Sequence, residues 1–262
     1  MMKTLVVAFL LVACIAATSY GAEEPYQIFP LRLKSGSGPE GASVQGITCA
    51  SWRLAVEVHN IIEWTGIPAE CRDYVGNYML GQHYRDDSKA VNREAYFYAR
   101  SLALPRDGRN IWIFDIDETS LSNLPYFVQN GFGALPYNET EFYEFLGKGV
   151  SPALPETRKL YNKLLNLGIK IVFLTGRTTD LTTATVANLK KAGYHTWHKL
   201  ILKDTTEHGD STAVVYKSAE REKLVKQGYR IVGNIGDQWS DILGTHTGRR
   251  TFKLPDPVYY VS

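Results

Sequence analysis

The sequence lacks the features that set unusual proteins apart from ordinary globular ones. Its 22 glycines and 11 prolines among 262 residues are too few for a collagen-like or low-complexity chain. The 29 lysines and arginines nearly balance the 27 aspartates and glutamates, so the formal net charge is only +2. This balance gives no electrostatic basis for a nucleic-acid partner. A chain of this length forms one large domain or two small ones.

Long apolar runs are also absent, except for one at the extreme N-terminus. Lys3 precedes the apolar run Leu5–Ala17, which small residues and then Glu23 and Glu24 follow. This order is typical of a cleavable signal peptide, whereas a spanning helix needs about 20 apolar residues. We therefore predict a signal peptide over residues 1–21, entry into the secretory pathway and no membrane association after cleavage. An uncleaved anchor is the alternative.

Cysteine is scarce, with three residues in the whole chain. Cys14 lies in the predicted signal peptide, which leaves Cys49 and Cys71 as an even pair in a protein bound for an oxidising compartment. The chain between them is long enough for the bond to close, so we predict a disulfide. Clustered Cys and His residues are missing, so a structural zinc site has no basis.

One N-x-S/T sequon is present, at Asn138-Glu139-Thr140. Because the chain is predicted to be exported and the sequon lies in a polar, turn-like stretch, we predict an N-glycan on Asn138.

Residues 49–104 have the apolar spacing of helices. We expect one helix over Ser51–Trp64, with its apolar stripe packed on the core. That stripe consists of Leu54, Val58, Ile61 and Ile62. A second helix is expected over Lys89–Leu104, with Ser88 as its N-cap. Pro105 then ends the helical part.

The pattern changes to alternating strands and helices after Pro105. We predict helices over Leu181–Lys191 and Ser218–Lys226. Strands are expected over Asn110–Phe114, Lys170–Leu174, Lys199–Leu202, Tyr229–Ile235 and Thr251–Leu254. Such alternation predicts an α/β fold with a mostly parallel, Rossmann-like sheet flanked by helices. Ligands of these sheets bind beyond the carboxyl ends of the strands.

The first of these strand ends carries Asp115 and Asp117 in the pattern DxDxT. Residues two apart on an extended segment share a face, so their carboxylates lie about 7 Å apart. Two such charges repel each other unless a cation or a proton offsets them. An ordinary acidic turn is the alternative to a reactive site.

The second strand ends in Thr175-Gly176-Arg177, a hydroxyl, a small residue and a cation. This grouping suits an anion, although the tripeptide alone is common.

Three more polar residues lie at the ends of the later predicted elements. Lys217 comes just before the predicted helix Ser218–Lys226, and a lone lysine is usually a surface residue. Asp237 and Asp241 end the strand Tyr229–Ile235 and place two more carboxylates at the same edge.

In this order, DxDxT, hydrophobic-Thr-Gly, an isolated lysine and GDxxxD resemble the four-motif signature of the haloacid dehalogenase superfamily of phosphotransferases. Further segments resemble the plant acid phosphatase and vegetative storage protein group. These are Asp115–Phe127, Pro152–Thr157, Asn188–Trp197, Gly228–Asp241 and the closing FKLPDPVYYV. The resemblance implies an N-terminal extension and helical region over residues 22–105, then a catalytic core over 106–262. A small insert, or cap, is expected at about 120–155.

The resemblance also implies roles for the motif residues. Asp115 stands where the family has its nucleophile, and its attack on phosphorus gives an aspartyl-phosphate. Asp117 is the implied general acid and base. Thr175, Gly176 and Lys217 are the implied phosphate-binding residues.

A divalent cation, Mg²⁺, is the implied cofactor, because the site offers only oxygen ligands. Its ligands are expected from Asp115, the main-chain carbonyl of Asp117, and Asp237. Asp241 is expected to orient the metal shell or Lys217.

We therefore expect an Mg²⁺-dependent acid phosphatase that acts on a small phosphomonoester in the vacuole or outside the cell. The alternative is a vegetative storage protein with vestigial activity, and retention of Asp115 favours the enzyme. A phosphate-dependent binding module is less favoured, since it needs no Asp115–Asp117 pair. The aromatic residues of the insert either shape a leaving-group pocket or only pack the insert onto the core. A homodimer is left open.

Overall fold

The computed structural model describes residues 43–262, so the predicted signal peptide lies outside the described residues. Within that part of the chain, none of the helices has the length and apolar character needed to cross a membrane.

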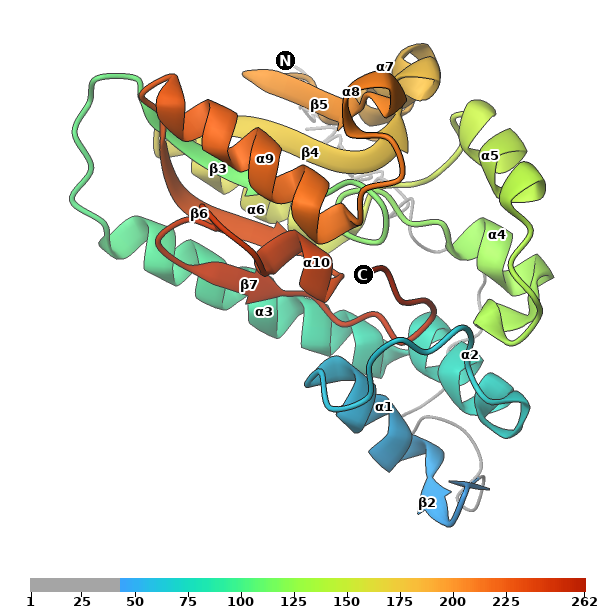
Figure 1. The fold of residues 1–262 in the computed structure, drawn as a ribbon. Coiled ribbons are helices and arrows are strands. Elements are labelled where there is room, and N and C mark those ends of the chain that lie inside the picture. The colour runs from blue at the N-terminus through green and yellow to red at the C-terminus, as the bar shows by residue number, and fades with distance from the viewer. Residues whose placement is uncertain (1–42) are drawn as a thin grey trace, which may run out of the picture.

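A five-stranded parallel sheet forms the centre of the molecule (Figure 1). The strand order is β5-β4-β3-β6-β7, and each neighbouring pair is parallel. The strands are β3 (Asn110–Phe114), β4 (Lys170–Thr178), β5 (Lys199–Lys203), β6 (Arg230–Gly236) and β7 (Thr251–Lys253). The predicted α/β class is confirmed. Strand β4 runs four residues beyond its predicted end and takes in the Thr-Gly-Arg motif.

Helices cover both faces of the sheet, so the central strand β3 is buried throughout. Trp112 packs on one face with α3 (Gln82–Ser101) and α6 (Pro155–Asn166). Ile113 packs on the other face with α9 (Ala213–Lys226). Alternation of side chains along the strand thus gives two apolar layers, as expected for a doubly covered parallel sheet. The remaining C-terminal helices are η3 (Thr179–Leu181), α7 (Thr182–Lys191), α8 (Thr205–His208) and α10 (Trp239–Ile242).

The N-terminal region and the insert share one apolar cluster. In the N-terminal region are β1 (Ser43–Val44), β2 (Ile47–Thr48), α1 (Cys49–Glu57), η1 (Ala69–Cys71) and α2 (Arg72–Leu80). In the insert are α4 (Leu124–Gln129), η2 (Gly131–Gly133) and α5 (Glu139–Gly147). Trp52 and Tyr78 belong to the same buried cluster as Tyr126 and Phe145. The two regions therefore pack together at one end of the sheet (Figure 1).

The predicted disulfide is present between Cys49 and Cys71, whose Cα atoms lie 5.4 Å apart. Both residues are buried. The bond closes a loop of 22 residues that joins the start of α1 to the start of α2.

The first predicted helix is wrong in length and in its buried face. Helix α1 ends at Glu57, and the chain then turns through His59 and Glu63, both with positive φ. Leu54 is 60% exposed, whereas Trp52 and Val56 are buried. The predicted apolar stripe therefore extends beyond the end of the helix, and its residue Leu54 faces solvent instead of the core.

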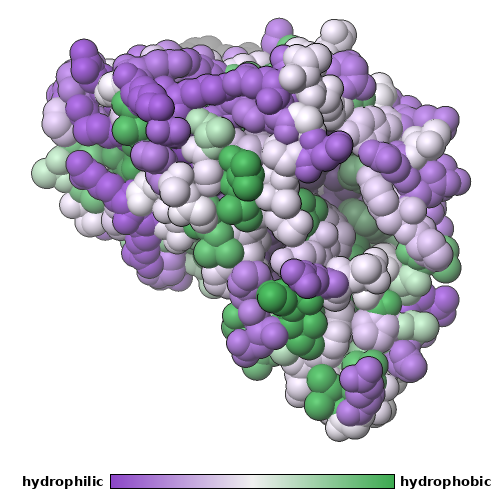
Figure 2. All heavy atoms as spheres, in the orientation of Figure 1, coloured by the Kyte–Doolittle hydropathy of each residue, from purple (hydrophilic) through white to green (hydrophobic). Residues whose placement is uncertain are grey.

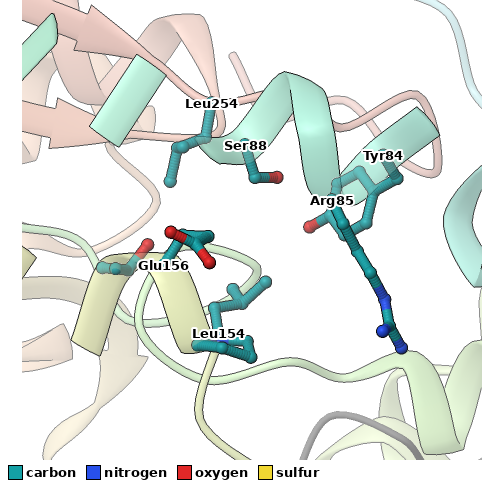
Figure 3. A pocket seen from close by; sticks show the side chains of 8 residues that line it. Tyr84, Arg85, Ser88, Leu154, Glu156 and Leu254 are labelled. Atoms are coloured by element: carbon teal, nitrogen blue, oxygen red, sulfur yellow. The ribbon is translucent and has the colours of Figure 1, made fainter. Parts of the chain in front are cut away.

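The predicted N-cap at Ser88 is also wrong, because Ser88 lies inside α3. Its side chain faces a small cavity of about 40 Å³ between α3 and the start of α6 (Figure 3). Leu154 and Glu156 line the same cavity. Such a volume accommodates a few waters at most, so we assign this cavity no function.

Candidate active site

The polar residues that follow different strands meet at the carboxyl edge of the sheet. Oxygens of Asp115, Asp237 and Asp241 lie within 4.8 Å of one another, and all three residues are buried. Asp115 follows β3, while Asp237 and Asp241 follow β6, the neighbouring strand. Parallel strands end at a common edge, which explains why residues more than a hundred positions apart converge here.

Lys217 is the fixed cation of this cluster. Its Nζ donates to Asp115 Oδ1 at 2.7 Å and to Asp241 Oδ1. Only 5% of Lys217 is exposed, so the surface alternative is excluded. It lies inside α9 rather than before it, since this helix begins at Ala213.

Opposing effects act on the pKa of Asp115. Burial raises it most, the neighbouring Asp241 raises it further and Lys217 lowers it, leaving a pKa well above the usual range. Burial alone lowers the pKa of Lys217, but Asp115 and Asp241 outweigh burial and raise it. The lysine is therefore charged, and the carboxylates exceed the positive charge available from it.

Asp117 stands apart from this cluster and pairs with Arg177. Arg177 Nη2 donates to Asp117 Oδ1 at 2.7 Å, and Nε donates to both carboxylate oxygens. Asn123 Nδ2 adds a bond of 2.8 Å. Burial raises the pKa of Asp117, but Arg177 and these hydrogen bonds outweigh burial and lower it. Asp117 is therefore held ionised.

The role of Arg177 differs from the anion-binding cation that the tripeptide suggested. Its guanidinium is buried and occupied by Asp117 and by Thr185. Thr175 accepts from Arg177 N at 3.1 Å, and its hydroxyl lies 3.5 Å from Asp117. Gly176 is exposed on the cavity wall. The motif thus positions Asp117, and its residues Gly176 and Arg177 line the cavity.

Asp237 is held by residues that sequence reasoning did not single out. Its carboxylate accepts from Thr119 Oγ1 at 2.8 Å, from Gln238 Nε2 at 2.9 Å and from the Tyr259 hydroxyl at 2.9 Å. Burial, then the neighbouring Asp256, raises the pKa of Asp237 well above its usual range. Thr119 is the last residue of DxDxT, so the motif itself could have identified it as a site residue. Tyr259 lies in the closing segment, where no local periodicity signals a role.

The cluster has the donor set that a hard divalent cation prefers. Asp115, Asp237 and Asp241 offer buried oxygens close together, and Lys217 alone does not neutralise them. The Asp117 carbonyl lies 3.5 Å from the Tyr259 hydroxyl that contacts Asp237, so it belongs to the same edge. Mg²⁺ favours carboxylate and carbonyl ligands of this kind.

A cavity of about 790 Å³ is lined by Asp115, Asp117, Lys217 and Asp241. Its walls include the carboxyl edge of the sheet, the insert, the loop before α2 and the last residues of the chain. Figure 2 shows the molecule hollowed on this face, beside the side that α4 and α5 form. Five aromatic residues of the insert line the cavity: Tyr126, Phe127, Tyr137, Phe142 and Tyr143. Phe145 does not line the cavity and packs in the core. Tyr126 and Phe127 line the cavity and also belong to the buried cluster, so the same rings line the cavity and pack the insert.

Comparison with known proteins gives a consistent result. The family model described as HAD superfamily, subfamily IIIB (Acid phosphatase), matches residues 34–262. Stem 28 kDa glycoprotein of Glycine max is 53% identical over 262 residues, covering 99% of this chain and 100% of the relative. Acid phosphatase 1 of Solanum lycopersicum is 47% identical, covering 85% of this chain and 87% of the relative. Vegetative storage protein 1 of Arabidopsis thaliana is 48% identical, covering 85% and 82%.

Solved structures show the same fold at lower sequence identity. The class C acid phosphatase from Bacillus anthracis has a TM-score of 0.59 at 18% identity, covering 81% of this chain and 86% of that chain. The same enzyme with tungstate bound has a TM-score of 0.57 at 21% identity, covering 73% and 86%.

Proposed function

Because this chain belongs to the acid phosphatases of HAD subfamily IIIB, we propose that it hydrolyses small phosphomonoesters through an aspartyl-phosphate on Asp115, with Mg²⁺ as cofactor. The chain is a phosphomonoesterase. The aspartyl-phosphate mechanism and the role of Mg²⁺ are our proposals. The observation that carries the proposal is the position of Asp115, buried at the cavity floor with one oxygen held by Lys217.

The first half-reaction forms a bond between an Asp115 oxygen and phosphorus. Lys217 fixes one oxygen of the carboxylate and leaves the other to attack. The bond from phosphorus to the leaving oxygen breaks, and that oxygen takes a proton from Asp117. Asp117 donates this proton only from its protonated form. Arg177 lowers the pKa of Asp117 and so disfavours that form, and an acidic compartment increases the protonated fraction.

The second half-reaction uses the same residue in reverse. Asp117 accepts a proton from water, the water oxygen attacks phosphorus, and the bond to Asp115 breaks to release phosphate. Asp117 is ionised once it has protonated the leaving group, and its low pKa keeps it in the ionised form that this step needs. Thr175 and Lys217 are proposed to bind the phosphoryl oxygens. Gly176 has no side chain, so it leaves space for the phosphoryl group at its part of the cavity wall.

Asp115, Asp237 and the Asp117 carbonyl would hold Mg²⁺, with Asp241 positioned by its bond to Lys217. When bound, the cation stabilises negative charge on the phosphoryl group. Thr119 and Tyr259 hold the Asp237 carboxylate in place.

We propose that the chain is exported, on the basis of its relatives. The relatives include plant stem glycoproteins and vegetative storage proteins, which indicate a secretory or vacuolar location. Asn138 is exposed, and its Oδ1 caps α5 by accepting from Glu141 N at 3.3 Å. An N-glycan is attached through Nδ2, so we propose that Asn138 carries one without loss of the cap.

A storage role is the second candidate, since vegetative storage proteins are among the relatives. Release of phosphate from p-nitrophenyl phosphate, with Mg²⁺ and then with EDTA, separates the two. Turnover that depends on the metal supports the enzyme. Negligible turnover of several phosphomonoesters between pH 4 and 8 leaves storage as the function.

A further inference from the structure

The large cavity is lined by acidic side chains in addition to the aspartates at the sheet edge. Glu63 and Glu139 line it, from the disulfide-closed loop and from the start of α5. Within residues 43–262 neither glutamate forms a salt bridge. The cations that line the cavity among the described residues are Arg177 and Lys217, and both already contact aspartates of the site. A leaving group with further negative charge therefore finds no uncommitted cation here.

The same walls are rich in aromatic rings from three separate segments. Trp64 lies 6.2 Å from Tyr260 and Phe127 stacks on Tyr259 at 5.6 Å, centroid to centroid. Tyr126 and Tyr143 complete the wall on the insert side. Aromatic faces with nearby carboxylates are the surroundings that bind quaternary ammonium groups, through cation–π attraction and opposite charge.

We propose that this cavity selects phosphomonoesters whose leaving group is a small quaternary ammonium alcohol, as in phosphocholine. The inference rests on the proposed phosphatase function and specifies its substrate class. Phosphate binds at Asp115 and Lys217, while the trimethylammonium group occupies the aromatic wall next to Glu63 and Glu139. A neutral leaving group of the same shape gains only apolar contact.

The loop that carries Glu63 is built to hold it at the cavity. Glu63 has a φ of 56°, a conformation that costs energy for a residue other than glycine and persists only when the surroundings enforce it. The next residue, Trp64, packs edge-on against Trp52 at 5.6 Å, and the Cys49–Cys71 bond closes the loop. These contacts place one acidic and one aromatic side chain together on the cavity wall.

The experiment compares two esters that differ in one atom of the leaving group. Phosphocholine and 3,3-dimethylbutyl phosphate have the same shape, but the second has carbon in place of the charged nitrogen. We expect kcat/KM of the full mature protein to be about tenfold higher for phosphocholine, within the range of cation–π and ion-pair contributions. In Glu63→Gln/Glu139→Gln the ratio should fall to about two or less.

A matched control has the same change of charge on the same elements. Glu70→Gln/Glu144→Gln alters two exposed glutamates of the loop and of α5 that do not line the cavity. It should keep the wild-type ratio. The proposal is overturned if wild type prefers the neutral ester or shows no preference, or if both double variants lose the preference equally.

Failure of the enzyme is a separate outcome. If p-nitrophenyl phosphate is not hydrolysed, the proposed function fails, and calorimetric binding of the two esters decides the charge preference on its own. Tighter binding of phosphocholine that the Glu63→Gln/Glu139→Gln variant loses supports the pocket. Equal binding of the two esters overturns it.

Discussion

The ammonium of Lys217 lies 2.7 Å from Asp115 Oδ1, with both side chains buried at the carboxyl edge of the sheet. A cation fixed there keeps the carboxylate oriented toward the cavity and reduces the repulsion from Asp241. Because both groups have left water, we expect the pair to matter to folding as well as to the proposed reaction.

Removal of this cation should damage stability and activity together. Lys217→Met leaves Asp115 and Asp241 buried without their partner, which typically costs about 3–5 kcal/mol. Denaturant unfolding of the metal-free protein should show the loss, and added Mg²⁺ should recover part of it. Unchanged unfolding in Lys217→Met would mean that the pair contributes nothing to the folded state.

Asp117→Asn should slow the second half-reaction more than the first. The amide oxygen can still accept from Arg177 and Asn123, so the fold should be retained, at reduced stability because the buried Arg177 loses its counter-charge. Steady-state turnover should fall about 10²–10⁴-fold, the range for a positioned acid or base. Stopped-flow measurement with p-nitrophenyl phosphate, a good leaving group, should show a burst of nitrophenol followed by slow turnover. A variant with full steady-state activity contradicts the role given to Asp117.

The metal-free protein should lose stability as the pH rises from about 4.5 to about 8. Burial is the largest cause that raises the pKa of Glu118 and that of Asp256 to about 8, and neighbouring carboxylates contribute to the increase. A carboxyl with a higher pKa in the folded than in the unfolded state binds its proton more tightly when folded. Stability from that proton is fully present below the unfolded pKa, 4.5 for Glu118 and 3.8 for Asp256, and disappears as the pH passes through the folded value.

Thermal unfolding in EDTA between pH 4.5 and pH 8 measures this trend. Mg²⁺ should reduce the loss at high pH, because the bound cation offsets the negative charge of Asp115 and Asp237. A melting temperature in EDTA that rises steadily over the same interval contradicts the assignment.

The Cys49–Cys71 bond should matter to the cavity as well as to the fold. Cys49→Ser/Cys71→Ser should lower the free energy of unfolding by about 3 kcal/mol, the value for a loop of this size in the chain-entropy model. Freedom of the loop that carries Trp64 should also raise KM more than it lowers kcat. Equal KM values for variant and wild type, measured well below the melting temperature, would exclude the loop from substrate binding.

The sequence predicted the carboxyl edge of the sheet better than the surroundings of the cavity. Strand β3 matched its predicted bounds because an uninterrupted apolar run directly before DxDxT has few alternative structures. The burial of Asp115 and Asp237 at one edge followed from the rule that parallel strands end together.

Features that depend on long-range packing escaped prediction. The apolar stripe of Leu54 and Val58 has helical spacing, but the helix ends at Glu57 and Leu54 faces solvent. Tyr259 reaches Asp237 only because the closing segment folds back across the sheet edge, and no local pattern encodes that path. The pairing of Arg177 with Asp117 likewise depends on the approach of two strands.

The most direct test of the account is the site of covalent phosphorylation during turnover. Acid quenching of the mature enzyme with excess phosphomonoester, followed by peptide mapping, should place the phosphoryl group on Asp115. The variant Asp115→Asn should give no phosphorylated peptide and no measurable turnover, while its sheet stays folded. A phosphoryl group on any other residue, or Asp115→Asn turning over at a rate near wild type, would contradict the mechanism.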